Sequence, residues 1–259
     1  MELEEILKSL KAGKLPLSEA RRLLSLYSLE KIEDFAQIDV SRKMRRGIPE
    51  VIFAENKSFG DIKKIIQSVL KRSKSILISR LSKGDYSRVK DYAKKRKIKT
   101  KLGKKASSIL LYKKNLQNTL GRVGIVTAGT SDIGVAEEAR LMCEAMNCSC
   151  ICKYDVGIAG VHRIFPVLKD FLENDVDVII VVAGMEGALA TLVSSLVDIP
   201  VIGVPTSVGY GYGEKGIAAL AAMLQSCSLG LSVVNIDNGI GAGAIAASIS
   251  NRVSRKRSN

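Results

Sequence analysis

Residues 176–204 read VDVIIVVAGMEGALATLVSSLVDIPVIGV, and this stretch decides the fold. Its apolar runs at 176–183 and 200–204 have the length and the valine and isoleucine content of buried strands. The segment between them, 186–197, is long enough for a helix that follows a glycine-rich turn. A strand, a helix and a second strand in this order predict two parallel strands joined by a crossover helix.

The same alternation extends along the chain in both directions. Further strands are expected at 122–128, 148–154 and 231–236, and further helices at 132–146, 161–174, 215–227 and 242–251. Successive units of this kind favour a doubly wound parallel sheet with helices on both faces, a three-layer α/β fold of the flavodoxin or Rossmann type. We assign this C-terminal domain to residues 119–259.

Residues 1–118 predict a smaller, basic α/β domain with leading helices. The leading helices are expected over 2–11 and, after Pro16, over 18–29, and a connector is expected at 33–39. Strands at 51–54, 75–80 and 107–112 then alternate with helices at 59–72 and 83–96. The chain therefore predicts two α/β domains, one after the other.

The charge of the chain is divided unequally between its halves. Residues 1–120 carry 30 Lys and Arg against 13 Asp and Glu, whereas 121–259 carry 10 against 13. A basic half can bind nucleic acid or phosphate-rich ligands. Here the basic run from Lys83 to Lys105 alternates with apolar and aromatic residues, as in a solvated helix and strand, and no groove-reading motif accompanies it. We therefore do not expect nucleic acid as a partner.

Several features indicate a cytoplasmic protein. The opening MELEEILKSL is acidic and amphipathic, unlike a signal peptide. The apolar stretch at 176–204 contains Asp177, Glu186 and Asp198, whereas a membrane span needs about 20 nearly uncharged residues, so no membrane association is expected. Five cysteines, an odd number, argue for reduced thiols rather than a disulfide framework.

Three of these cysteines, Cys148, Cys150 and Cys152, alternate along one expected strand and share a face. Soft thiolate ligands raise the possibility of a metal site. Side chains in a row along one strand diverge poorly around a single ion, however, and no CxxC spacing occurs. We interpret them as small buried hydrophobic residues and expect no structural metal.

Ligands of open parallel sheets bind beyond the carboxyl ends of the strands, where glycine-rich loops lead into helices. The expected strands place five such segments there: TAGTSD (127–132), DVGIAGVHR (155–163), AGMEGA (183–188), PTSVGYGYG (205–213) and VNIDNGIGAG (234–243). Their backbone N–H groups can approach a phosphate. Each loop taken alone also has a purely structural interpretation, such as an empty helix cap, a structural histidine at His162, or a glutamate at Glu186 that complements a helix dipole.

Cys227 is placed differently from these loops. It lies at the C-terminal end of the expected helix and precedes Ser228-Leu229-Gly230. The C-terminal end of a helix does not favour a thiolate, and activation of this thiol needs a partner.

Five motifs taken together resemble the LarB family, the pyridinium-3,5-biscarboxylic acid mononucleotide synthases, whose catalytic domain is related to PurE, the aminoimidazole ribonucleotide (AIR) carboxylase. These motifs are TAGTSD (127–132), YDVGIAGVHR (154–163), VVAGMEGAL (181–189), VIGVPTSVGYGYG (201–213) and SCSLGLSVVNIDNGIGAG (226–243). The segment RRGIPEVIFAENK (45–57) resembles the leading domain of LarB, which PurE lacks. The resemblance covers nearly the whole chain.

The resemblance implies a step of nickel-pincer nucleotide synthesis. CO2 carboxylates C5 of the pyridinium ring of nicotinic acid adenine dinucleotide, and hydrolysis of the phosphoanhydride releases AMP. An electron-poor ring becomes nucleophilic once a thiolate has added to it, which is covalent catalysis. By motif position the resemblance makes Cys227 the nucleophile and Glu186 the carboxylate that handles the ring proton, and places His162 in the histidine motif of PurE.

The resemblance also implies substrate contacts from several loops. Thr130, Ser131 and Asp132 hold ribose and phosphate in this scheme, and Gly160, Arg163, Gly184, Met185, Ser207, Gly209, Asp237 and Asn238 complete the substrate site. Mg2+ is expected with the pyrophosphate and CO2 as co-substrate, without a tightly bound organic cofactor. A homo-oligomer, by analogy with PurE an octamer, is expected, with subunits that complete each other's sites.

Two other functions stay open. A true AIR carboxylase of purine biosynthesis needs no cysteine nucleophile. A regulatory protein that senses a nucleotide, or binds nucleic acid through its basic half, would bind without turnover.

Overall fold

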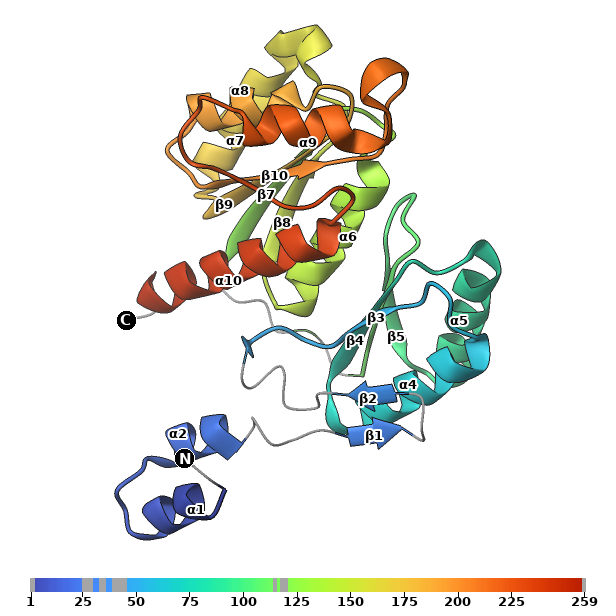
Figure 1. Ribbon diagram of the computed structural model, residues 1–259, viewed down its shortest axis with the longest axis vertical. Coiled ribbons are helices and arrows are strands. Elements are labelled where there is room, and N and C mark those ends of the chain that lie inside the picture. Colours follow the sequence, from blue (N-terminus) through green and yellow to red (C-terminus); the bar gives the residue numbers. More distant parts are fainter. Residues whose placement is uncertain are drawn as a thin grey trace.

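The computed structural model describes residues 3–24, 30–32, 36–38, 46–113, 116 and 121–257 (Figure 1). It contains two α/β units, each built around its own sheet, which confirms the predicted fold class. None of the helices within these ranges is both long and apolar enough to cross a membrane. The predicted domain boundary at residues 118 and 119 lies outside the described residues.

The C-terminal sheet has five parallel strands in the order β11-β10-β9-β7-β8. They are β7 (Arg122–Thr127), β8 (Ser149–Lys153), β9 (Val178–Ala183), β10 (Val201–Pro205) and β11 (Leu231–Val233). Counted along the chain this is the 2-1-3-4-5 order of flavodoxin-like folds, in which the topological switch point lies between the first and third strands. The switch point here falls between β7 and β9, which pair directly.

Helices cover both faces of this sheet because its central strands are apolar on both sides. Val178, Ile180 and Val182 of β9 belong to one core cluster, while the alternate residues of the same strand belong to another. The first face is covered by α6 (Ile133–Ala145) and α10 (Gly239–Arg257), and the second by α7 (Ile164–Glu173), α8 (Ala188–Leu196) and α9 (Ile217–Leu224) (Figure 1).

The N-terminal sheet is smaller and mixed, in the order β3-β4-β6-β5. Its strands are β3 (Val51–Phe53), β4 (Ser75–Ser79), β5 (Lys99–Leu102) and β6 (Ile109–Tyr112), flanked by α4 (Phe59–Arg72) and α5 (Lys83–Lys95). Each of these helices begins at a serine cap: Ser58 and Ser82 accept hydrogen bonds from backbone N–H groups three residues on. The helices α1 (Leu3–Lys11) and α2 (Leu17–Leu24) and the antiparallel pair β1 (Glu30–Ile32) and β2 (Ala36–Ile38) precede them.

Four elements depart from the sequence prediction. The strand β1 had no predicted counterpart, the expected connector at 33–39 contains β2, and β5, with the sequence KTKL, had no predicted bounds. The last helix was expected at 242–251 but extends over Gly239–Arg257. Its end is anchored because Arg257 pairs with Asp175 and Asp177 at 2.9 Å each, and the side chain of Asp177 is fully buried. The basic tail therefore compensates a buried carboxylate.

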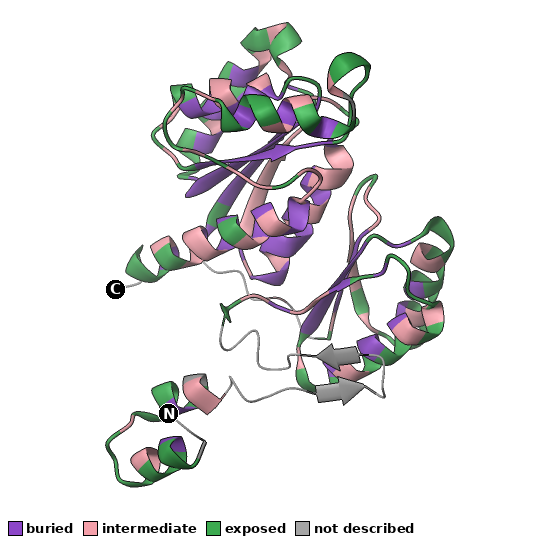
Figure 2. Ribbon diagram, viewed as in Figure 1, coloured by how far each residue is buried: buried purple, intermediate pink, exposed green. Residues whose placement is uncertain are grey.

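Helix α6 lies between the two sheets. Leu77 of β4 and Leu110 of β6 belong to the same buried cluster as Val123 of β7 and Ala139 of α6. Figure 2 shows that α6 is buried or half-buried along its length, unlike the outer helices. The two units share one hydrophobic core through α6, so the N-terminal sheet is fixed relative to the loop that leads into this helix.

Candidate active site at the carboxyl edge of the parallel sheet

Asp132 joins the ends of three neighbouring strands. Its side chain is buried, with the residue 3% exposed. One carboxylate oxygen accepts the N–H of Gly129 at 2.8 Å, and the other accepts the hydroxyl of Thr206 at 2.7 Å. Burial raises the pKa of Asp132, and hydrogen bonds from Thr206, Gly129 and the backbone of Gly184 offset only part of this rise. Asp132 thus holds the loops after β7, β9 and β10 together rather than facing solvent.

The loops after β9, β10 and β11 are tied to one another by backbone hydrogen bonds. The N–H of Met185 donates to the carbonyl of Val208 at 3.0 Å, and the N–H of Ser207 donates to the carboxylate of Asp237 at 2.9 Å. The N–H of Asp237 in turn donates to the carbonyl of Pro205 at 2.9 Å. The structure therefore brings together these predicted site residues: Asp132, Gly184, Met185, Ser207, Gly209 and Asp237.

Gly184 must be a glycine for these loops to meet. A Cβ at this position would lie 2.1 Å from the carbonyl oxygen of Val208 and 2.7 Å from the hydroxyl of Thr206.

We expect Gly184→Ala to separate the two loops, to lower the free energy of unfolding by about 1–3 kcal/mol and to abolish ligand binding. Gly84→Ala is the control, because the Cβ of an alanine there would meet nothing within 4 Å. Urea unfolding and ligand titration of both variants test this, and equal behaviour of the two would contradict the packing described.

The loop after β8 packs beside the loop after β7. The N–H of Asp155 donates to the hydroxyl of Thr127 at 3.1 Å, and a Cβ on Gly157 would lie 2.8 Å from the carbonyl oxygen of Ala128. Arg163 folds this loop on itself by donating to the carbonyls of Asp155 and Gly160 at 3.0 and 3.4 Å. His162 is exposed on the short 3-10 helix η2 (Ile158–Arg163), within the same loop.

Some residues of these loops adopt a strained backbone conformation. Non-glycine residues rarely adopt a positive φ, and such strain tends to collect at functional sites. Four occur at the carboxyl edge: Asp155 (φ 61°), Met185 (φ 52°), Lys215 (φ 61°) in the short 3-10 helix η3 (Gly211–Gly216), and Asp237 (φ 55°). Each lies in the loop that follows a different strand.

The first loop presents its backbone to solvent. Thr130 and Ser131 are exposed, and their N–H groups meet no acceptor among the residues the structure describes. Asn238, at the start of α10, accepts the N–H of Gly241 at 2.8 Å and so caps that helix. The carboxyl edge therefore offers N–H donors to an anion beside the exposed Glu186.

Cys227 lies at the opposite edge of the sheet. It follows α9, which runs back from the carboxyl end of β10, and it precedes β11, whose first residue pairs with the first residue of β10. A helix of eight residues such as α9 spans about 12 Å. Within one chain, Cys227 is therefore not brought together with Glu186 or His162.

The five cysteines differ in exposure, and Cys227 is the exposed one. A hydrogen bond to Cys143, together with burial, raises the pKa of the Cys150 thiol, and burial raises the pKa of Cys152 to about 12. We expect iodoacetamide at neutral pH to label Cys227 in the native protein and to leave Cys150 and Cys152 unlabelled, as peptide mass spectrometry would show. Cys227→Ser should remove the rapid labelling, and rapid labelling that persists in this variant would contradict the assignment.

Among the residues with described positions, no three Cys, His, Asp or Glu side chains cluster as metal ligands.

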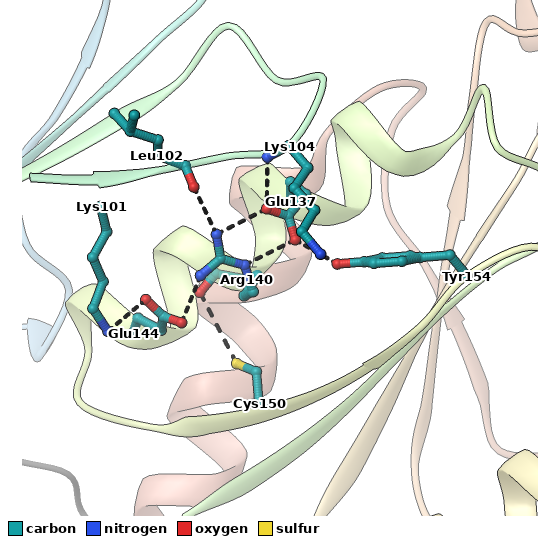
Figure 3. Close-up of polar contacts among 8 residues, drawn as sticks. All are labelled: Lys101, Leu102, Lys104, Glu137, Arg140, Glu144, Cys150 and Tyr154. Atoms are coloured by element: carbon teal, nitrogen blue, oxygen red, sulfur yellow. Dashed lines mark hydrogen bonds and ion pairs between the residues drawn. The ribbon is translucent and has the colours of Figure 1, made fainter. Parts of the chain in front are cut away.

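A buried ionic network joins the two units beside this site (Figure 3). Glu137 of α6 is 1% exposed and accepts hydrogen bonds from the Arg140 guanidinium, the Tyr154 hydroxyl and the backbone N–H of Lys104. Burial opposes its ionisation, but these donors outweigh burial and lower the pKa of Glu137. Arg140 also binds Glu144 at 2.7 Å. Sequence reasoning missed this network, because its signal, an EEAR segment on a helix, also fits a solvated face.

Comparisons with known proteins agree with this architecture. The family model described as AIR carboxylase matches residues 122–257, and the model described as LarB/PurE-like N-terminal domain matches residues 29–111. An uncharacterized protein of Methanocaldococcus jannaschii is 44% identical over 251 residues, 95% of this chain and 96% of that protein.

Two relatives that are named as enzymes match about half of the chain. The N5-carboxyaminoimidazole ribonucleotide mutase of Thermotoga maritima is 31% identical over 132 residues, 49% of this chain and 74% of that enzyme. The enzyme of the same name from Pyrococcus horikoshii is 30% identical over 132 residues, 49% of this chain and 71% of that enzyme. The AIR carboxylase domain, preceded by a LarB-type N-terminal domain, shows that the chain belongs to the LarB/PurE family of carboxylase-type enzymes.

Proposed function

We propose that this protein carboxylates C5 of the pyridinium ring of nicotinic acid adenine dinucleotide and hydrolyses its phosphoanhydride, a step of nickel-pincer nucleotide synthesis. The observation that carries the proposal is the combination of a LarB-type N-terminal domain with an AIR carboxylase domain whose strand-end loops meet at one edge of the sheet. The exposed thiol of Cys227 supplies the nucleophile that a pyridinium substrate needs.

The proposed chemistry balances without an external oxidant or reductant. The Cys227 thiolate adds to a ring carbon, and its electron pair neutralises the pyridinium charge. The resulting enamine carbon C5 attacks CO2 and forms the new carbon–carbon bond. Glu186 then removes the C5 proton, and departure of the thiolate restores the aromatic pyridinium. Hydrolysis of the phosphoanhydride by water releases AMP.

Mg2+ fits the donor set at the carboxyl edge. This ion is usually held by one or two carboxylates together with substrate phosphates, so a cluster of three protein ligands is not required. Asp155 is exposed and Asp237 half-buried there, whereas both oxygens of Asp132 are already engaged. Bound Mg2+ would neutralise charge on the pyrophosphate. Asp155 follows β8 and Asp237 follows β11, at opposite ends of the strand order, so we expect one of the two, together with the substrate phosphates, to hold the ion.

A site of this kind has to be shared between copies of the chain. Cys227 and Glu186 lie at opposite edges of one sheet, so the thiol can reach a ring beside Glu186 only from a neighbouring subunit. The surface leading to Cys227 is apolar: Ile217, Leu224 and Leu229 are 61%, 67% and 93% exposed. Exposed apolar surface of this kind marks an association site. We infer a homo-oligomer, with the octamer of PurE as the expected form.

The purine alternative has specific support, because two of the relatives are N5-carboxyaminoimidazole ribonucleotide mutases. The two activities can be separated with one variant. Purified protein is assayed with nicotinic acid adenine dinucleotide or with aminoimidazole ribonucleotide, in each case with bicarbonate and Mg2+. We expect AMP release from the dinucleotide by the wild type and none by Cys227→Ala. Carboxylation of aminoimidazole ribonucleotide that survives Cys227→Ala would favour the purine alternative and contradict our proposal.

A further inference from the structure

The turn between β5 and β6 of the N-terminal domain is fixed to α6 at successive residues. The carbonyl of Leu102 accepts a hydrogen bond from Arg140 at 3.0 Å, and the N–H of Lys104 donates to Glu137 at 2.8 Å. The backbone of Lys105, which has φ 53°, packs so closely on α6 that a Cβ at Gly134 would lie 2.8 Å from its carbonyl oxygen. These contacts hold the turn rigidly against α6, the helix that follows the loop at 127–132.

Two lysine side chains extend from this turn toward the loops of the candidate site. The Lys105 ammonium donates to the carbonyl of Thr130 at 3.4 Å. The Lys104 ammonium lies 5.8 Å from the centre of the Tyr154 ring, which directly precedes the loop after β8 (Figure 3). Both lysines are exposed. The N-terminal domain thus places two cations beside the loops that follow β7 and β8.

Neither contact uses all the hydrogen-bond donors of the lysine ammonium group involved. A separation of 3.4 Å is long for a hydrogen bond, and its acceptor is a neutral carbonyl, whereas an ammonium has three donors. The contact of Lys104 with a ring face leaves its donors available to a ligand. A phosphate oxygen is a stronger acceptor for both groups.

The C-terminal domain itself offers little positive charge to these loops. Residues 121–259 carry 10 Lys and Arg against 13 Asp and Glu. The Arg163 guanidinium is engaged by carbonyls of its own loop, and Lys153 pairs with Asp170 at 2.6 Å. A dinucleotide carries two linked phosphates, so its charge needs compensation from elsewhere.

We propose that Lys104 and Lys105 of the N-terminal domain bind the pyrophosphate of the dinucleotide substrate, an inference that rests on the proposed function of the carboxyl-edge site. The LarB-type domain then has a defined role in substrate selection. It supplies cations for a second phosphate to the AIR carboxylase domain, which has few cations of its own beside these loops. The two lysines are substrate-binding residues and take no part in bond formation at the ring.

The test compares binding of nicotinic acid adenine dinucleotide and of nicotinic acid mononucleotide by calorimetry, using the full-length protein. Lys104→Ala and Lys105→Ala should each weaken binding of the dinucleotide about tenfold, since a charged hydrogen bond is lost, and binding of the mononucleotide should change less. Lys105→Arg should retain binding. Lys90→Ala is the matched control, because Lys90 is exposed on α5, away from the turn. The double variant should also show a weaker dependence of binding on salt.

The outcomes separate this inference from the proposed function. Dinucleotide binding by the double variant as tight as that of the wild type and Lys90→Ala overturns the inference, even if turnover is normal. A lowered melting temperature with unchanged affinity overturns it too, since that result assigns the lysines a purely structural role. Lysine-dependent binding of the dinucleotide without carboxylation supports the inference and contradicts the proposed function alone.

Discussion

Hetero-oligomers of Cys227→Ala and Glu186→Gln will recover about a quarter of the wild-type carboxylation activity, although neither variant alone will form product. Each variant lacks one essential group, the thiol in the first and the carboxylate in the second. In a site built from two copies, random assembly gives one site in four an intact thiol and an intact carboxylate. The separation of Cys227 from Glu186 across one sheet is the physical reason.

The measurement uses co-expressed chains that carry different tags, so that mixed oligomers can be purified. A matched control mixes the wild type with the double variant Cys227→Ala/Glu186→Gln. Sites shared between copies should again give about a quarter of full activity, whereas sites within one chain would give about half. Mixed single variants that stay as inactive as their parents would show that both residues act within the same chain, contrary to the geometry described here.

Arg140→Leu will lower the free energy of unfolding by about 3–5 kcal/mol, because it leaves the buried carboxylate of Glu137 without its ionic partner. Glu137 is 1% exposed and takes two hydrogen bonds of 2.8 Å from the Arg140 guanidinium. The control is Lys169→Ala, which breaks an exposed pair with Glu173 and should cost less than about 1 kcal/mol. Urea unfolding of the three proteins decides the point, and equal costs would show that the network contributes little.

The same network makes stability depend on pH in a defined direction. Because the folded pKa of Glu137 is lowered, its stabilising contribution is present above its ordinary value of 4.5 and is lost as pH falls through the folded pKa. The wild type should therefore lose stability on acidification more steeply than Glu137→Gln. Since Glu137 also accepts the N–H of Lys104, its protonation should loosen the turn that carries the two lysines.

Much of the parallel sheet could be predicted because its strands are self-evident apolar runs. In β9 every residue is buried, so its sequence does not alternate between apolar and polar residues. The order of the strands then places the glycine-rich loops at one edge whatever their detailed conformation. The strand order alone predicts where these loops lie, but it does not predict the hydrogen bonds between them.

Elements that depend on distant partners were beyond prediction. Three of the four residues of β5 are polar, and this segment is a strand because it pairs with β6. Glu137 is buried because Tyr154, 17 residues away, and Lys104, 33 residues away, close over it. Asp132 is predicted to hold ribose and phosphate, and the sequence does not show that Gly129 and Thr206 engage its two carboxylate oxygens. Each of these contacts is tertiary and leaves no periodic trace in the sequence.

The most direct test of the account is the fate of 13C-labelled bicarbonate. The wild-type protein is incubated with nicotinic acid adenine dinucleotide, Mg2+ and the labelled bicarbonate, and the products are identified by mass spectrometry. We predict AMP and a mononucleotide whose pyridinium ring carries one new 13C carboxylate, with neither product formed by Cys227→Ala. A dinucleotide recovered unchanged, under conditions in which the protein is folded and binds it, would contradict the proposed carboxylation.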